Sequence, residues 1–217
     1  SLTEAERASF TGTYRLSPIH RAQLTNTGDG LQVVVDRGRP ASGLHPFIES
    51  DLYPLSSTRL ATDIADVHVR RRSGSNELTL AWKDTTYVLT PVESTFTLPT
   101  GDLRAGRYEQ AANRLRRAQS SGFKLDSWIT SALTARADTL EARGHPEDAL
   151  RYNRLAVELF PESWRVYSSL AYNYELLGQT AAAISAYRRF RALDPSRAEA
   201  VNERLRKLER SDEGREE

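Results

Sequence analysis

Two residue patterns in this sequence could carry chemistry, and the first is Ser121-Gly122-Phe123-Lys124. A lysine three residues after a serine can serve as the base that activates the serine hydroxyl as a nucleophile. Such a nucleophile also needs positioned partners, and the sequence contains neither a Tyr-x-Asn nor a Lys-Thr-Gly pattern to supply them. Because the stretch falls in a predicted loop between helices, we interpret it as a coincidence and predict no catalytic residues in this chain.

The second pattern is the set of four histidines, which are His20, His45, His68 and His145. Their spacing is not that of metal ligands. The first three could converge inside a barrel, but a site would also need carboxylate partners and an open coordination position. We therefore predict no metal site and no cofactor. The run Arg70-Arg71-Arg72 could contact an anion, yet an isolated run in a near-neutral region is typical of a solvated strand end.

Composition narrows the function classes. The formal net charge is only +1, so neither nucleic acid nor an anionic membrane surface is an expected partner. Cysteine is absent, which excludes disulfides and thiolate metal sites and leaves the redox compartment undecided. We expect no membrane span and no signal peptide, since no long apolar run is present. The chain begins at Ser1 and has no methionine, which predicts a piece of a longer protein or a processed chain.

The elements that would position a site change character near residue 100. In the second half, Gly144 and Gly178 lie 34 residues apart, and so do Pro161 and Pro195. Glycine can end a helix in the left-handed conformation, and proline stops the next one. The period therefore predicts repeated helical hairpins.

These hairpins resemble the tetratricopeptide repeat family. The later unit carries the family's first-helix series and its second-helix landmarks, which are Tyr167, Leu170, Ala171, Tyr174, Gly178, Ala183, Tyr187 and Asp194-Pro195. The earlier unit departs from the pattern, since Arg136 replaces the usual leucine and Asn153 the usual aromatic residue. A partial unit at Ala105–Ala112 precedes it, and Glu199–Leu208 is expected to cap the stack.

The resemblance implies a peptide-binding groove lined by the first helix of each hairpin. In register, the predicted groove residues are Thr134, Asp138, Glu141, Arg165, Ser168, Tyr172, Glu175, Asn202 and Arg206. This mixture differs from the basic, asparagine-rich clamp with which some relatives grip a carboxylate terminus. The alternative for each residue is a solvated helix face without a ligand.

The first half alternates short strand-like runs with turn signals. Leu31, Val33 and Val35 alternate with more polar positions, and Gly28-Asp29-Gly30 supplies a turn. The predicted strands are Phe10–Leu16, Ala22–Asn26, Leu31–Asp36, Leu52–Ser56, Val67–Arg71, Glu77–Trp82 and Tyr87–Val92. About seven or eight such strands predict a small antiparallel barrel or sandwich, and the whole chain is then an α+β protein of two domains.

A second resemblance concerns this β half. Phe10-Thr11-Gly12-Thr13-Tyr14, Leu44-His45-Pro46, Tyr53-Pro54-Leu55 and the strand ending in Trp82 look like the lipocalin-like domain that follows the catalytic domain of β-lactamase and penicillin-binding-protein-type serine hydrolases. We predict a linker over residues 1–8, this β domain over 9–95, the helical domain over 96–209 and a disordered tail over 210–217.

Together the resemblances imply a non-catalytic, C-terminal accessory region of a bacterial serine hydrolase, acting in docking or self-association. Its partner would be a protein, a peptide or the catalytic domain of the same polypeptide, in the periplasm or outside the cell. The main alternative is a binding protein whose barrel holds a small apolar ligand, which needs an apolar cavity of about 300 Å³ or more. An enzyme with an unrecognised site is a third.

Overall fold

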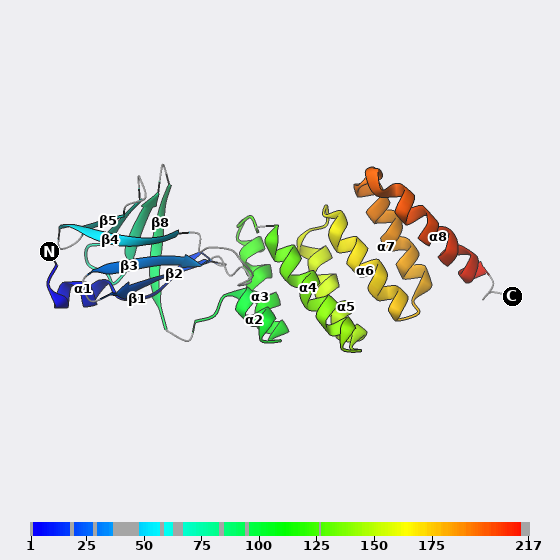
Figure 1. Ribbon diagram of the computed structural model, residues 1–217, viewed down its shortest axis with the longest axis horizontal. Helices are drawn as coiled ribbons and strands as arrows, with labels where there is room; N and C mark the ends of the chain where they lie inside the picture. The colour runs from blue at the N-terminus through cyan, green and yellow to red at the C-terminus, as the bar shows by residue number, and fades with distance from the viewer. Residues whose placement is uncertain are drawn as a thin grey trace. The chain divides into compact units, whose positions relative to one another are not determined.

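A computed structural model shows a β-rich half followed by a helical half (Figure 1). It describes residues 2–17, 20–27, 30–36, 48–56, 59–62, 67–82, 85–93, 96–125 and 127–213. The chain divides into two compact units, Ser1–Asp102 and Leu103–Glu217. The division falls within the short helix α2 (Pro99–Arg104).

The first unit is a closed antiparallel barrel. Its strands are β1 (Gly12–Ser17), β2 (His20–Asn26), β3 (Leu31–Asp36), β4 (Ile48–Ser56), β5 (Arg59–Thr62), β6 (Val67–Arg71), β7 (Leu78–Trp82) and β8 (Thr85–Val92). Each strand pairs with its neighbours in sequence, and β1 also pairs with β8, which leaves no free edge. The predicted α+β class is confirmed, and the β half is a barrel and not a sandwich.

Two strand predictions need correction. Strand β5 was not predicted, because its four residues Arg59–Thr62 are too short to show an alternating pattern. The pairing of Leu60 with Pro54 on one side and Val69 on the other holds it in the sheet. Phe10 was predicted to open the first strand, but it is the last residue of helix α1 (Glu4–Phe10).

Helix α1 begins with a capping box. The backbone amide of Glu6 donates to Thr3 Oγ1 at 3.2 Å, and the amide of Thr3 donates to Glu6 Oε2 at 2.8 Å. At its other end Phe10 is fully buried in the barrel core. The guanidinium of Arg71 lies 4.9 Å from the centre of the Phe10 ring and donates to the carbonyl of Ser9. The helix is thereby attached to β6, so most of the predicted linker belongs to the β unit.

The turn from α1 into β1 explains the glycine of the Phe-x-Gly-x-Tyr motif. Gly12 has φ +154°, and a Cβ there would lie 3.5 Å from the ring of Tyr14. The hydroxyl of Tyr14 donates to the carbonyl of Phe10 at 2.9 Å. Glycine therefore serves both the backbone conformation and the close approach of the ring.

The barrel interior is apolar at the positions that the structure describes. Its fully buried side chains include Phe10, Leu24, Leu31, Leu60, Leu78, Leu80 and Leu89. These side chains form one contiguous cluster with Val33, Val35 and Val69. The described interior is thus a packed core of the kind that burial of alternate strand residues produces.

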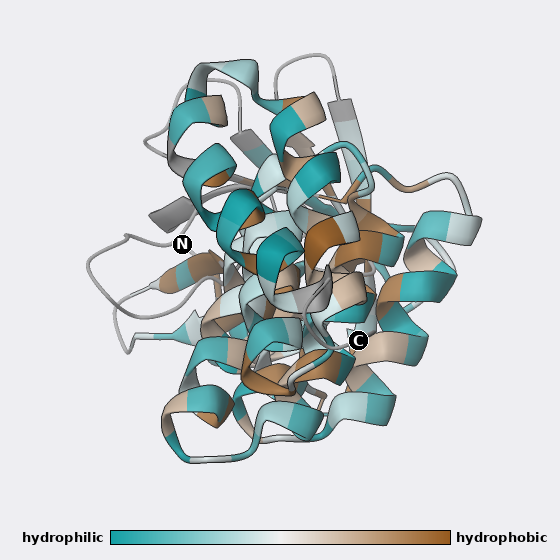
Figure 2. Ribbon diagram, turned by 90° about the vertical axis from the view of Figure 1, so that its right-hand side faces the viewer, coloured by the Kyte–Doolittle hydropathy of each residue, from teal (hydrophilic) through white to brown (hydrophobic). Residues whose placement is uncertain are grey.

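The second unit is a series of helical hairpins. After α2 come α3 (Tyr108–Ser120), α4 (Trp128–Ala142), α5 (Pro146–Leu159), α6 (Trp164–Leu176), α7 (Thr180–Leu193), a 3-10 turn (Pro195–Arg197) and α8 (Ala198–Glu213). We call α4 and α5 the earlier repeat and α6 and α7 the later repeat. The helices are banded, with hydrophilic and hydrophobic residues on different faces (Figure 2).

Glycine turns end the first helix of each hairpin. Gly106, Gly144 and Gly178 have φ of +73°, +79° and +66°, the left-handed conformation that the 34-residue period predicted. Ala149 and Ala183 are fully buried where the second helix of each repeat packs closely on the first. The hairpin prediction is confirmed by these turns and helix bounds.

The last helix extends further than expected. Helix α8 runs to Glu213, so residues 210–213 of the predicted disordered tail are helical. Arg210 Nε donates to the carbonyl of Arg206 at 3.2 Å, and Val201 and Leu205 bury the inner face of the helix. Once that face is docked, the last turn continues with residues of good helix propensity, which explains the difference.

Candidate functional site

The earlier repeat has polar side chains where the later repeat has apolar ones. Asn153 and Asn173 are both 0% exposed, and Asn153 occupies the place that Tyr187 holds in the later repeat. Asn153 Nδ2 donates to the carbonyl of Ser169 at 3.4 Å, and Asn173 Nδ2 donates to that of Pro146 at 3.0 Å. These bonds join α5 to α6. The Oδ1 atoms of both asparagines are buried without a hydrogen-bond partner.

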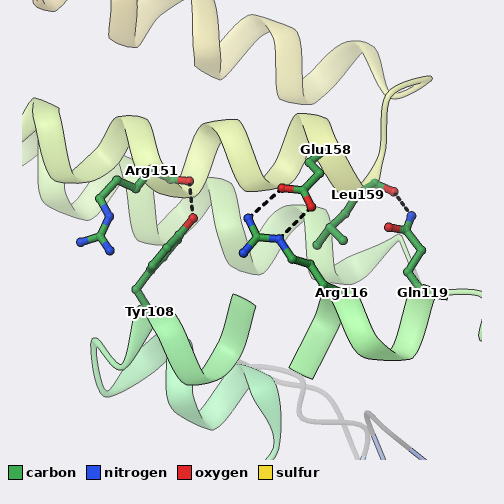
Figure 3. Close-up of polar contacts among 6 residues, drawn as sticks. All are labelled: Tyr108, Arg116, Gln119, Arg151, Glu158 and Leu159. Carbon is green, nitrogen blue, oxygen red and sulfur yellow. Dashed lines mark hydrogen bonds and ion pairs between the residues drawn. The ribbon is translucent and has the colours of Figure 1, made fainter. Parts of the chain in front are cut away.

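The junction between α3 and α5 is also polar. Arg116 makes two hydrogen bonds of 2.8 Å to the carboxylate of Glu158, and Gln119 Nε2 donates to the carbonyl of Leu159 at 3.0 Å (Figure 3). The hydroxyl of Tyr108 donates to the carbonyl of Arg151 at 3.1 Å. Pairing with Glu158 raises the pKa of Arg116, and pairing with Arg116 lowers the pKa of Glu158. These groups satisfy one another and leave no unused charge at this seam.

One predicted groove residue, Glu175, is occupied by structural contacts. Its carboxylate accepts from the hydroxyl of Tyr187 at 2.6 Å and from Arg204 Nε at 2.9 Å. The three side chains tie α6, α7 and α8 together. Burial, and then the hydrogen bond to the Glu175 carboxylate, raise the pKa of Tyr187, so its hydroxyl stays a proton donor.

Other predicted groove residues are partly engaged within the protein. Asn202 Oδ1 accepts from Arg191 at 2.8 Å, and the guanidinium of Arg165 lies 4.7 Å from the centre of the Trp164 ring. Thr134 makes only a long bond of 3.4 Å to the carbonyl of Ser131. Ser168 is half-buried, and Arg206 is exposed with its Nε donating to the carbonyl of Asn202.

The two remaining acids of the predicted groove, Asp138 and Glu141, are different. Although Asp138 reaches solvent, neighbouring side chains remove part of its hydration, and this raises its pKa. Burial also raises the pKa of Glu141, and the charge of Asp138 adds to the effect. Hydrogen bonding with the side chains of Asn153 and Asn173 opposes these effects. Oε1 of Glu141 is buried without a hydrogen-bond partner.

Other acids of the helical unit have arginine partners. The ion pairs are Glu109–Arg151, Glu158–Arg116, Glu162–Arg189, Glu175–Arg204, Asp194–Arg197 and Glu209–Arg188, with N···O distances between 2.5 and 3.2 Å. Among the described residues, Asp138 and Glu141 have no such partner. Arg136 of the same helix points elsewhere, with its Nη2 against the turn at Gly106. The pair is therefore a partly desolvated negative charge that the fold itself does not use.

Apolar surface lies on the neighbouring first helix. Tyr172 is 48% exposed and Leu176 is 47% exposed, and their spacing of four residues puts them on one face of α6. Tyr172 corresponds to Asp138 at the 34-residue period, so both face the same way on successive first helices. We call Asp138, Glu141, Tyr172 and Leu176 the groove patch. Leu176 was not predicted, because leucine in an amphipathic helix normally signals the core.

The other chemical candidates do not assemble into a site. Ser121 Oγ donates to the carbonyl of Ala118 at 2.8 Å at the end of α3, and Lys124 is exposed. His45 lies outside the described residues, and the described part of the chain has no group of three potential metal-ligating His, Cys, Asp or Glu side chains. None of its helices is long and apolar enough to cross a membrane.

A surface pocket of about 740 Å³ lies at the tip of the β6–β7 hairpin and not within the barrel. Its lining includes Arg70, Arg71 and Arg72, with Ser73–Asn76 at the turn. Two of these arginines are engaged, since Arg71 holds α1 and Arg72 pairs with Glu77 at 3.0 Å. The pocket therefore presents little unused positive charge.

No protein-family model matches this chain, and no curated protein matches it. Among solved structures, the first TPR of Spaghetti (RPAP3) bound to an HSP90 peptide is 24% identical over 52% of this chain and 86% of that chain, with a TM-score of 0.36. MamA is 21% identical over 54% of this chain and 65% of that chain, with a TM-score of 0.36. A mutant of MamA is 15% identical over 52% and 79%, with a TM-score of 0.37. The tetratricopeptide-type architecture of this chain rests on its own glycine turns, helix lengths and 34-residue period.

Proposed function

We propose that the helical unit binds a peptide segment of another protein across its first helices, and that the chain is a binding module and not an enzyme. The observation that carries the proposal is the groove patch, which combines two exposed apolar side chains with two partly desolvated carboxylates that lack a partner. Exposed large apolar residues and perturbed, unpaired charges on one face are typical of interaction sites.

The location of the patch supports the same proposal. Asp138 and Tyr172 lie at equivalent positions of α4 and α6, and these helices are neighbours in the stack. A ligand lying across successive first helices contacts side chains from several repeats at once, which is how a short array can present a specific surface. Glu175 and Asn202 shape the edge of this face through their internal bonds and do not contact the ligand with free groups.

The test is a selection of short random peptides displayed on phage against the full chain. We expect enriched peptides that bind the wild-type chain and lose about tenfold or more in affinity for Tyr172→Ala combined with Leu176→Ala. The matched control is Val88→Ala, which removes a 40% exposed apolar side chain from the barrel. Failure to enrich any peptide, or equal binding to the groove variant, would overturn the proposal.

We further propose that the β unit is the lipocalin-like accessory domain of a β-lactamase-type serine hydrolase, with the helical unit docking partners or a second copy for it. Support comes from the Phe10–Tyr14 motif and its turn, and from the closed barrel of eight strands, a number shared with lipocalins. A periplasmic or extracellular location goes with this assignment.

The test of this assignment is the reading frame that encodes the chain. A Ser-x-x-Lys domain upstream of Ser1 is the expected finding, and the longer protein should then hydrolyse a chromogenic β-lactam or a related ester. The present chain alone should not hydrolyse it. Activity of this chain by itself would contradict the non-catalytic assignment, and an upstream region without such a domain would contradict the hydrolase origin.

A further inference from the structure

The groove patch also indicates the chemistry of the partner, an inference that rests on the proposed peptide binding. We propose that Asp138 and Glu141 receive a lysine or arginine side chain of the bound peptide, while an apolar side chain of the same peptide packs on Tyr172 and Leu176. The argument starts from the two carboxylates. In a unit where six other acids hold an arginine, these two hold none among the described residues.

An acidic pair alone would not make a site, and the second observation is the pair of buried asparagines. Asn153 and Asn173 are 0% exposed and border the carboxylate of Glu141, and the Oδ1 atom of each lacks a partner. A buried oxygen without a donor is unfavourable by about 1–3 kcal/mol in a folded protein. The neighbourhood of Glu141 is therefore rich in acceptors and short of donors.

A basic side chain supplies what this neighbourhood lacks. The lysine ammonium has three donors and the arginine guanidinium has five, and neither has an acceptor. Glu141 is half-buried, so part of its side chain reaches the surface while Oε1 lies inside, and Asp138 stands one helical turn away at the surface. A cation bound between them would restore the charge balance that burial has disturbed.

The apolar half of the patch fixes the spacing that the peptide needs. Asp138 and Tyr172 are equivalent positions on neighbouring helices, and packed helix axes lie about 8–10 Å apart. An extended chain advances about 3.3 Å per residue. The basic and the apolar residue of the peptide should therefore lie about three positions apart.

The test uses the same displayed random peptides with the full chain and two charge variants. One variant combines Asp138→Asn with Glu141→Gln. The matched control combines Glu147→Gln with Asp148→Asn, which removes the same charge from exposed positions in the first turn of α5. Circular dichroism and thermal unfolding check that both variants are folded before binding is compared.

The expected result is enrichment of peptides with lysine or arginine about three residues from an apolar residue, and a loss of about tenfold in affinity for the Asp138/Glu141 variant only. Affinity should also fall as salt is raised, because a partly exposed ion pair is screened. Peptides that need Tyr172 but carry no basic residue, or that bind the acid variant equally well, would overturn this inference and leave peptide binding intact. No enrichment at all would overturn both.

An inorganic cation is the other occupant that these oxygens could attract. Calcium chloride is therefore added to the peptide-free chain in the unfolding measurement. A rise in Tm that disappears in the Asp138/Glu141 variant, without enrichment of basic peptides, would assign the patch to an ion and overturn the inference. No such rise is expected, because calcium prefers six to eight oxygen ligands and the patch offers few carboxylates.

Discussion

The earlier and the later repeat have the same helical hairpin but different interiors. The later repeat lies in an apolar cluster that contains Leu170, Ile184, Tyr187 and Phe190, closed by Val201 and Leu205 of α8. The earlier repeat instead buries Asn153, with Asn173 of α6 against it, and leaves Asp138 and Glu141 without partners. The difference indicates that stability is concentrated in the later repeat and an unused, ligand-seeking charge in the earlier one.

The comparison is sharpest at Glu141 and Glu175, which are equivalent at the 34-residue period. Helix α8 brings Arg204 to Glu175, and the following helix of the same repeat brings Tyr187. Glu141 meets asparagine side chains instead, so it gains no opposite charge. Identical residues at equivalent positions therefore differ in role because of what the next helices carry.

The largest expected effect is in the later repeat. Leu170→Ala should lower the free energy of unfolding by about 3 kcal/mol, because it removes a buried side chain and leaves a cavity. Urea unfolding followed by circular dichroism measures it. The matched change is Arg136→Ala at the equivalent, half-buried place of the earlier repeat, which should be much milder. Equal losses would remove the contrast between the repeats.

Next in size is the loss of the carboxylate at position 175. Glu175→Gln should destabilise the fold by about 1–2 kcal/mol, since it weakens two hydrogen bonds and leaves Arg204 without its ion pair. Hydrogen exchange should show the change first in α8, the helix that the contact holds. An unchanged exchange pattern in α8 would show that apolar packing of Val201 and Leu205 suffices to dock it.

The same substitution in the earlier repeat should have the opposite sign. Glu141→Gln is expected to stabilise the chain at pH 7 by a few tenths to about 1 kcal/mol, because it removes a partly desolvated charge whose effect solvent still screens. Thermal unfolding beside the wild type measures the gain. A loss of stability would mean that the carboxylate is well satisfied where it lies.

The pH dependence checks the cause of that gain. The folded state raises the pKa of Glu141, so the folded chain holds its proton to a higher pH than the unfolded chain does. Stability therefore falls as pH rises between the unfolded and the folded pKa, and the loss is complete above the folded pKa. Below the unfolded value, about 4.3, the carboxyl is protonated in both states, and the advantage of Glu141→Gln should disappear.

The smallest expected effect on stability is at the exposed face of α6. Tyr172→Ala should change the free energy of unfolding by no more than about 0.5 kcal/mol, because nearly half of the side chain already meets solvent. The same variant should lose peptide binding. A large loss of stability would instead identify Tyr172 as a packing residue and weaken its place in the groove patch.

Much of the architecture could be predicted from local signals. The glycines and prolines at a fixed period give the hairpins, because backbone conformation at a turn depends mainly on the residue that occupies it. Alternation gave most of the strands, but Arg59–Thr62 was missed because four residues are too few for a pattern. The choice between barrel and sandwich depends on the pairing of β1 with β8, which the sequence does not encode locally.

The sequence by itself determined the repeat period, the strand alternation and which positions of each first helix face a common side. Only the tertiary structure decided which of those positions are free. Glu175 is consumed by Arg204 and Tyr187, Asn202 by Arg191, whereas Asp138 and Glu141 stay unpaired. The physical reason is that the charge state and exposure of a side chain depend on groups contributed by other helices, many residues away in the chain.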